Sequence, residues 1–468
     1  MTDRVLVRRN TYYDSVTLML ASRDAEHVAG VDRAAAVTAT PVNSALLAEQ
    51  GFDLPDDLGP DDLVVAVRAR GEDAAVEAMR VVETILEGHM VSDTRSTDDV
   101  LHSLRSAVRA RRDVSVAFVS VPGRYAAYEV ASAIESGLHV FCFSDGISLA
   151  DEAALKKRAS DKGLLFMGAD CGTAIIDGVS FGFANAVTAG PVGVIGASGT
   201  GIQLVTCLLD SVGVGISHAI GVGGRDLSAE VGGAATTQVL DLLAADPATE
   251  TVAIISKPPD RAVAERVAEA AAACGKPVVM GLLGPRSPVE SRPGVEVVAS
   301  LEEVAVRAAA RAGRMLDTAD ADLPERPTPG DIRGLFCGGS LCIEAETAAG
   351  AIGFIDFGAD EYTEGRAHPM IDPTLRNEHF ARVAADPDVA AIVVDVVLGY
   401  GAHPDPATEL APLIETAQTT VIAVVCGTDG DPQGLSGQSE RLTKAGAVVT
   451  RNAAHAGRLA RAAVAVDA

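Results

Sequence analysis

The feature that most constrains the fold is a strand, glycine turn and helix signature that occurs twice in the 468 residues. The first copy runs from Gly190 to Gly201 and reads GPVGVIGASGTG; the second runs from Arg333 to Leu341 and reads RGLFCGGSL. Each is an apolar run that ends in glycines and is followed by a hydroxyl residue opening an amphipathic stretch. This pattern brings free backbone N–H groups and a helix dipole to one point. Each copy therefore predicts an anion-binding turn.

The segments that follow each turn keep the same order and lie roughly 135 to 150 residues apart, which suits a duplicated domain better than a solenoid repeat. After the first turn they are residues 217–224, 252–256, 276–281 and 295–300; after the second they are 353–358, 391–397, 420–427 and 447–451. The pattern predicts two homologous α/β domains.

Two of these segments, residues 252–256 and 391–397, are apolar almost throughout instead of alternating. Such runs are typical of strands covered on both faces by helices, so we expect parallel, doubly wound sheets. In these sheets ligands bind outside the carboxyl ends of the strands, where both glycine turns fall.

The sequence before the first glycine turn predicts a mixed α/β segment, followed by a third, incomplete α/β unit. A loop rich in acid and proline covers residues 53–62, a helix is expected at 73–88, and an acidic, proline-rich linker at 317–329. In the incomplete unit, strands are expected at 114–121, 140–144 and 164–168, and helices at 125–136 and 150–162. The expected domains are residues 1–110, 111–188, 189–318 and 330–468.

Composition excludes some partners. The formal charge of −26, from 64 acidic and 38 basic residues, opposes binding to nucleic acid or anionic lipid.

No apolar stretch reaches the roughly 20 residues of a membrane span, and the N-terminus lacks a signal-peptide pattern, so we expect a soluble cytoplasmic protein. The seven cysteines form no CxxC pair, which predicts reduced core thiols and no metal site.

A family resemblance rests on these motifs. Residues 190–256 resemble the ligase domain of the succinyl-CoA synthetase α subunit, and residues 330–468 resemble the matching β-subunit domain. Residues 119–123, 143–146 and 168–172 resemble three strand ends of the α subunit's CoA-binding domain. This order of parts, with a divergent N-terminus and the phrase RAHPMIDP at 366–373, is similar to the FdrA family. The resemblance covers residues 110–468. It implies a degenerate Rossmann-like CoA-binding domain and two tandem flavodoxin-like domains with parallel sheets.

The chain departs from the synthetases where they form a phosphohistidine. Their active-site histidine follows the fourth strand of the α ligase domain, but here that strand, at residues 278–284, passes through residues 285–288 directly to the next. No histidine lies between His218 and His368, and residues 256–260 (SKPPD) replace the GEIGG-like strand end. Before residue 110 there is no room for an ATP-grasp domain and no recognisable glycine turn for CoA phosphates. A self-sufficient ligase is therefore not expected.

The FdrA resemblance implies a subunit of oxamate carbamoyltransferase in purine (allantoin) degradation, acting beside companion subunits in an oligomer. Its ligand would be a small anion: carbamoyl phosphate, oxamate or an acyl-CoA, with CoA an optional cofactor. Two alternatives stay open: a CoA-binding acyl-CoA synthetase subunit, similar to succinate-CoA ligase, and a non-catalytic scaffold subunit that retains the ligase fold.

The candidate anion-binding residues lie at the two glycine turns and just past strand ends. The alternative for the turns is a structural need for close helix–sheet packing. Arg376 could clamp a carboxylate or be a surface arginine. The candidates are Ser198, Gly199, Thr200, Gly338, Gly339, Ser340, Lys257, Arg225 and Arg376, and a CoA-like groove would involve Gly123, Ser144, Gly146 and Gly168.

The candidate catalytic residues are His368, Arg366 and Asp372, in a proline-bracketed loop that follows the strand expected at 353–358. His368 could donate to a leaving phosphate, act as a general base or be phosphorylated; alternatively it is an ordinary loop residue.

The remaining polar residues are weaker site candidates or are expected to be structural. His403, at another strand end, is a second-rank candidate, and His218 is expected in the core. Asp226 and Glu230 are expected to cap or solvate a helix and not to bind metal.

Overall fold

The computed structural model describes residues 1–11, 13, 15–55, 57–91, 103–284, 289–319, 321–322, 328–363 and 366–464. The loop expected at 285–288 and part of the linker expected at 317–329 lie outside these ranges. The chain divides into two compact units, Met1–Leu101 with Phe357–Leu375, and His102–Asp356 with Arg376–Ala468. The sequence did not predict that residues 357–375 join the N-terminal unit.

The first unit contains a three-stranded antiparallel sheet with the order β1-β3-β2. Alternate residues of β3 face opposite ways: Val65 packs with α1 and α3, whereas Val64 packs with Leu47 of α2. The elements are β1 (Thr2–Arg8), α1 (Ser15–Glu26), β2 (Val31–Thr38), α2 (Pro41–Glu49), β3 (Leu63–Ala69), α3 (Glu72–Val91) and the short α12 (Asp360–Thr363).

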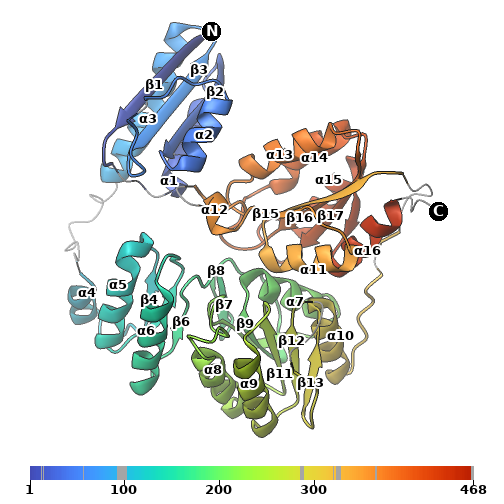
Figure 1. The fold of residues 1–468 in the computed structure, drawn as a ribbon. Helices are drawn as coiled ribbons and strands as arrows, with labels where there is room; N and C mark the ends of the chain where they lie inside the picture. The colour runs from blue at the N-terminus through green and yellow to red at the C-terminus, as the bar shows by residue number, and fades with distance from the viewer. Residues whose placement is uncertain are drawn as a thin grey trace. The chain divides into compact units, whose positions relative to one another are not determined.

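The second unit begins with α4 (Leu104–Ala110) and a small parallel sheet with the order β4-β5-β6 (Figure 1). Its strands and helices are β4 (Val116–Val119), α5 (Gly123–Glu135), β5 (His139–Cys142), α6 (Leu149–Asp161) and β6 (Phe166–Met167). These are the elements expected for the incomplete Rossmann-like unit. Helix α4 packs Leu104 against the core of this sheet, so the boundary expected near residue 110 comes one helix too late.

A seven-stranded sheet follows, with the order β13-β12-β11-β9-β10-β7-β8. The hairpin of β7 (Thr173–Ile176) and β8 (Val179–Gly182) extends this sheet by antiparallel pairing with β10, although the sequence grouped these residues with the preceding unit. The remaining elements are β9 (Ala189–Ala197), α7 (Gly199–Ser211), β10 (Ile216–Gly221), α8 (Ala234–Ala245), β11 (Thr251–Ser256), α9 (Arg261–Ala273), β12 (Val278–Leu282), β13 (Val295–Val298) and α10 (Leu301–Arg311).

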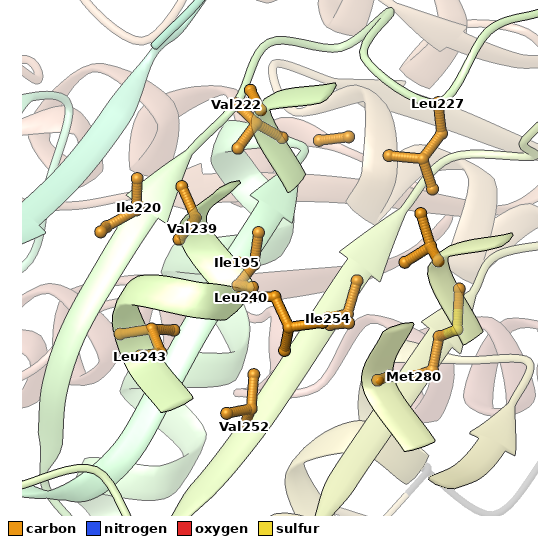
Figure 2. Packing of buried hydrophobic residues seen from close by; sticks show 14 of the residues in the cluster. Ile195, Ile220, Val222, Leu227, Val239, Leu240, Leu243, Val252, Ile254 and Met280 are labelled. Carbon is orange, nitrogen blue, oxygen red and sulfur yellow. The ribbon is translucent and has the colours of Figure 1, made fainter. Parts of the chain in front are cut away.

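The core of this domain lies between the sheet and its helices. Figure 2 shows Ile195, Val252 and Ile254 from the central strands meeting Val239 and Leu240 of α8. Strand β11 is buried along its whole length, as its apolar sequence predicted, because helices cover both faces of the sheet.

The last domain forms a five-stranded parallel sheet with the order β15-β14-β16-β17-β18. Its elements are β14 (Asp331–Phe336), α11 (Gly339–Ala349), β15 (Phe354–Asp356), α13 (Thr374–Ala384), β16 (Val389–Val397), α14 (Pro406–Thr416), β17 (Thr420–Cys426), α15 (Leu435–Lys444), β18 (Val448–Thr450) and α16 (Ala453–Ala463). The equivalent strands of the preceding domain run β10-β9-β11-β12-β13, which is the same order in chain sequence. The prediction of two homologous, flavodoxin-like domains is confirmed.

Candidate functional site

The two glycine turns meet within the second unit, where α7 and α11 lie side by side (Figure 1). Ser198 caps α7 by accepting a 2.9 Å hydrogen bond from the Gly201 N–H, and its hydroxyl lies 2.6 Å from the Ser340 hydroxyl. Gly338 packs against Thr200 so closely that a Cβ at residue 338 would lie 2.8 Å from the Thr200 methyl carbon. The structure therefore brings the residues predicted at the two turns together.

The N-terminal end of α7 has backbone N–H groups that can donate hydrogen bonds to a ligand. The N–H groups of Gly199 and Thr200 have no acceptor among the described residues, and both residues are partly exposed. No acidic side chain of the described part of the chain accepts a hydrogen bond from this turn. The α7 end is thus available to an external anion.

The N-terminal end of α11 faces the chain's own carboxylates. Asp395 accepts hydrogen bonds from Cys337 N (2.7 Å) and Gly338 N (2.9 Å). Burial raises the pKa of Asp395 to about 6, an effect that the nearby Arg376 and these two amides reduce. At Gly339 an added Cβ would collide with an oxygen of the Asp356 carboxylate. Sequence reasoning missed Asp395, although a lone charge inside the apolar run of β16 was a usable signal.

The three predicted cations have different surroundings. Lys257 follows β11, is exposed, and places its Nζ 3.2 Å from where a Cβ of Gly339 would stand, so it lies beside the paired turns. Arg225 instead pairs with Glu152 at 2.7 Å and donates to the Ile147 carbonyl.

Arg376 is buried below the α11 turn, so the surface-arginine alternative is wrong. Its Nη1 donates to the Asp395 carbonyl at 2.6 Å and lies 3.3 Å from the Cys337 sulfur. The carboxylate that it faces is Asp395, at 3.7 Å. Arg376 therefore holds the α11 turn in place, with its guanidinium directed at internal groups.

The His368 loop belongs to the first unit, which corrects its expected place in the C-terminal domain. Arg366 donates from Nε to Asn43, a fully buried side chain of α2. Asp372 accepts hydrogen bonds from the backbone and hydroxyl of Thr374, at 3.1 and 2.6 Å. These contacts hold the loop against the N-terminal domain.

His368 accepts a 3.2 Å hydrogen bond at Nδ1 from the Met370 N–H. Burial lowers the pKa of His368 to about 4, so the ring is neutral at pH 7. Because Nδ1 is the acceptor, the neutral ring carries its proton on Nε2. This tautomer suits a hydrogen-bond donor better than a general base or a phosphorylated nucleophile.

The residues of the CoA-like groove lie against neighbouring backbone. A Cβ at Gly123 would lie 2.6 Å from the Asp145 carbonyl and 2.8 Å from Gly146 Cα, and one at Gly168 would lie 2.8 Å from the Cys142 carbonyl. The Ser144 hydroxyl accepts from Val121 N at 2.8 Å. These contacts bring neighbouring backbone segments together at the strand ends and do not indicate a cradle for CoA.

The remaining polar candidates make local contacts. His218 is not in the core: its side chain is 22% exposed, Nδ1 accepts from Asp177 N, and Nε2 lies 3.6 Å from Asp246. His403 accepts at Nδ1 from Asp405 N, and its Nε2 lies 3.0 Å from Glu409.

Asp226 caps α8 as expected, because it accepts from Thr236 N at 2.9 Å. Glu230 is exposed. The described ranges hold no cluster of three or more metal-ligating side chains and no helix long and apolar enough to cross a membrane.

Comparison with known proteins places the CoA-binding match in the first flavodoxin-like domain, at residues 188–281, and not at residues 111–188 where the sequence motifs predicted it. Residues 335–463 match the CoA-ligase family, residues 188–281 match the CoA binding domain family, and residues 1–100 match the family described as "AllF, heavy metal-associated domain". The uncharacterized protein YahF of Escherichia coli is 36% identical over 98% of both chains. This chain belongs to the FdrA family of succinyl-CoA synthetase-like proteins.

More distant relatives of this FdrA-family chain are ligase subunits. Succinate–CoA ligase [ADP-forming] subunit alpha 1 of Archaeoglobus fulgidus is 28% identical over 42% of the chain and 66% of its own length. The ADP-forming sulfoacetate-CoA ligase subunit SauD of Bilophila wadsworthia is 30% identical over 42% of the chain and 68% of its own length. Among solved structures, an acetyl-coenzyme A synthetase of Ca. Korarchaeum cryptofilum matches 78% of the chain and 86% of its own length, with 16% identity and a TM-score of 0.37.

Proposed function

We propose that this FdrA-family chain is the carbamoyl-transfer subunit of an oxamate carbamoyltransferase and binds the phosphate group of carbamoyl phosphate where α7 and α11 meet. The observation that carries the proposal is the pair of helix N-termini joined through Ser198 and Ser340, with Lys257 beside them. The chain has no histidine between His218 and His368 to take up a phosphoryl group as the synthetases do. Phosphate would therefore be held here without a covalent bond.

The reaction needs charge stabilisation more than a nucleophile from the protein. The amide nitrogen of oxamate attacks the carbamoyl carbon, a C–N bond forms, and the C–O bond to phosphate breaks. The electron pair of that bond leaves with phosphate, which also receives the proton lost by the nitrogen. Backbone N–H groups at a helix N-terminus stabilise the charge that develops on the leaving phosphate.

In this proposal the loop of His368, Arg366 and Asp372, on the first unit, is a second functional element, and His368 is its candidate catalytic group. Its neutral ring accepts the Met370 N–H at Nδ1, and Arg366 and Asp372 hold the loop in shape. The proposal includes companion subunits and a cytoplasmic setting, as the family's association with purine degradation implies.

The test is oxamate-dependent release of inorganic phosphate from carbamoyl phosphate, followed by ³¹P NMR with the chain alone and with its companion proteins. His368→Ala should lower turnover by about a hundredfold or more and leave ligand affinity nearly unchanged. His403→Ala is the matched control, because His403 also precedes a proline and also accepts a backbone N–H two residues on. Equal activity of the two variants would show that His368 is only a turn residue.

The family matches favour a second candidate, a CoA-dependent acid–thiol ligase subunit. The close backbone contacts of Gly123 with Gly146, and of Gly168 with Cys142, argue against it. We expect millimolar CoA to leave the melting temperature unchanged. A rise of several degrees with CoA, together with no oxamate-dependent phosphate release in any mixture, would replace carbamoyl transfer by ligation. No activity and no CoA binding would leave a scaffold subunit.

A further inference from the structure

We infer that the phosphate group binds at the N-terminal end of α7 and not at that of α11. The N–H groups of Gly199 and Thr200 donate two hydrogen bonds to it, and the hydroxyl of Thr173 donates a third. The inference rests on the proposed function and deepens it, because it names the ligand group that this site takes. It also makes the two homologous turns unequal, although their sequences predict equivalent sites.

The α11 end is closed by groups of the chain itself. Asp395 occupies the N–H groups of Cys337 and Gly338, and the Asp356 carboxylate stands against Gly339. An external anion would have to displace these carboxylates or lie beside them, and like charges at such short range repel strongly. The α11 end therefore already holds its anions.

The α7 end has an unused donor besides its amides. Thr173, in β7, is 1% exposed, and its hydroxyl has no hydrogen-bond partner among the described residues. That oxygen lies 3.1 Å from where a Cβ of Gly199 would stand, so it faces the first residue of α7. A buried hydroxyl without a partner lowers stability, and such a group in a folded protein calls for a reason. Binding an anion here would supply its partner.

Glycines border this position on two sides. A Cβ added at Gly172 would have no neighbour within 4 Å, and Gly172 Cα lies 3.7 Å from the Cβ position of Gly199. Open space therefore reaches the backbone beside Thr173. A ligand that enters there approaches the amides of Gly199 and Thr200, next to the residue that carries the Thr173 hydroxyl.

The donor set suits a phosphate group. The N–H groups of Gly199 and Thr200 and the Thr173 hydroxyl supply three donors from different directions, which a tetrahedral phosphate can meet with separate oxygens. A planar carboxylate offers only two oxygens in one plane. Lys257 is not counted in this set, because its Nζ lies at Gly339 of the α11 turn, near the Asp356 carboxylate. The site therefore takes the phosphate of the carbamoyl donor, and the oxamate carboxylate binds elsewhere.

The experiment measures binding of inorganic phosphate to the full chain by isothermal titration calorimetry, with ³¹P NMR as a second readout. Thr173→Val keeps the side-chain shape and removes the hydroxyl. We expect it to weaken phosphate binding about tenfold or more, because hydrogen bonds to charged groups are the stronger ones. Without ligand it should melt at or above the wild-type temperature, since no hydrogen bond is lost. Thr173→Ser should retain binding.

Thr206→Val is the matched control, because Thr206 is equally buried in α7 and its hydroxyl donates to the Gln203 carbonyl, away from the helix end. It should bind phosphate as the wild type does. Equal phosphate affinity of the folded Thr173→Val variant and the wild type would overturn the inference, and so would a wild type that binds no phosphate at millimolar concentration. Thr173-dependent phosphate binding without carbamoyl transfer would uphold the site and overturn only the proposed reaction.

Discussion

At the scale of single residues, Lys156 shows how a charge can be buried in this fold. Its Nζ lies 2.6 Å from Asp226, 3.2 Å from Glu152 and 2.8 Å from the Val222 carbonyl, and the side chain is 2% exposed. Arg225, which the sequence marked as an anion-binding candidate, completes this cluster through Glu152. Its place there explains why a cation just past a strand end need not face a ligand.

Lys156→Met should lower the free energy of unfolding by about 3 to 5 kcal/mol, because it leaves buried carboxylates without their partner. Lys157→Met is the control: this neighbour is 74% exposed and, within the described ranges, pairs with Asp161 alone, so its loss should cost less than about 1 kcal/mol. Urea unfolding of both variants compares the two costs. Equal losses would show that the Lys156 cluster contributes no more than a surface pair.

At the scale of elements, Glu344 of α11 caps a helix of the neighbouring domain. It accepts hydrogen bonds from Leu301 N at 3.0 Å and Glu302 N at 2.9 Å, in the first turn of α10. Burial raises the pKa of Glu344 from 4.5 to about 8, an effect that the two amides and Arg458 oppose and Glu302 adds to. The pKa is higher in the folded than in the unfolded chain, so this group's contribution to stability is complete below pH 4.5 and is lost as the pH rises towards 8.

Glu344→Gln removes this titration. The variant should gain stability relative to the wild type as the pH rises from about 4.5 to 8, and the difference should level off above that. Urea unfolding at several pH values in this window measures it. Glu346→Gln, on the same helix with no hydrogen bond to α10 among the described residues, should show no such trend. A pH-independent difference for Glu344→Gln would contradict the raised pKa.

At the scale of the whole molecule, the two flavodoxin-like domains of the second unit are joined through Asp431. Its carboxylate accepts hydrogen bonds from Asn185 Nδ2 (2.8 Å), Ala186 N (2.7 Å) and Thr428 N (2.8 Å), so it links the segment before β9 to the loop after β17. The Asn185 amide also donates to the Leu398 carbonyl at 2.9 Å. These bonds couple the two domains across a buried junction.

Asp431→Ala should destabilise the protein by on the order of 3 kcal/mol, because three donors at a buried junction lose their acceptor. Calorimetry should then show two separated unfolding transitions in place of a coupled one. Asp429→Ala is the control from the same loop, since among the described residues that side chain bonds Ser436 in α15 alone. If both variants melt alike, Asp431 does not couple the domains.

The sequence by itself determined the duplicated domains, the order of their segments along the chain and the two glycine turns, because apolar strands and helix starts are signals of short range. It also located Ser198, Thr200, Gly338 and Ser340, which the fold brings together. Only the tertiary structure decided which cations pair internally, that residues 357–375 pack on the N-terminal domain, and that the α11 turn faces its own carboxylates. These outcomes depend on contacts between segments far apart in the chain, such as Thr173 with Gly199 or Cys337 with Asp395, and no local pattern encodes such a contact.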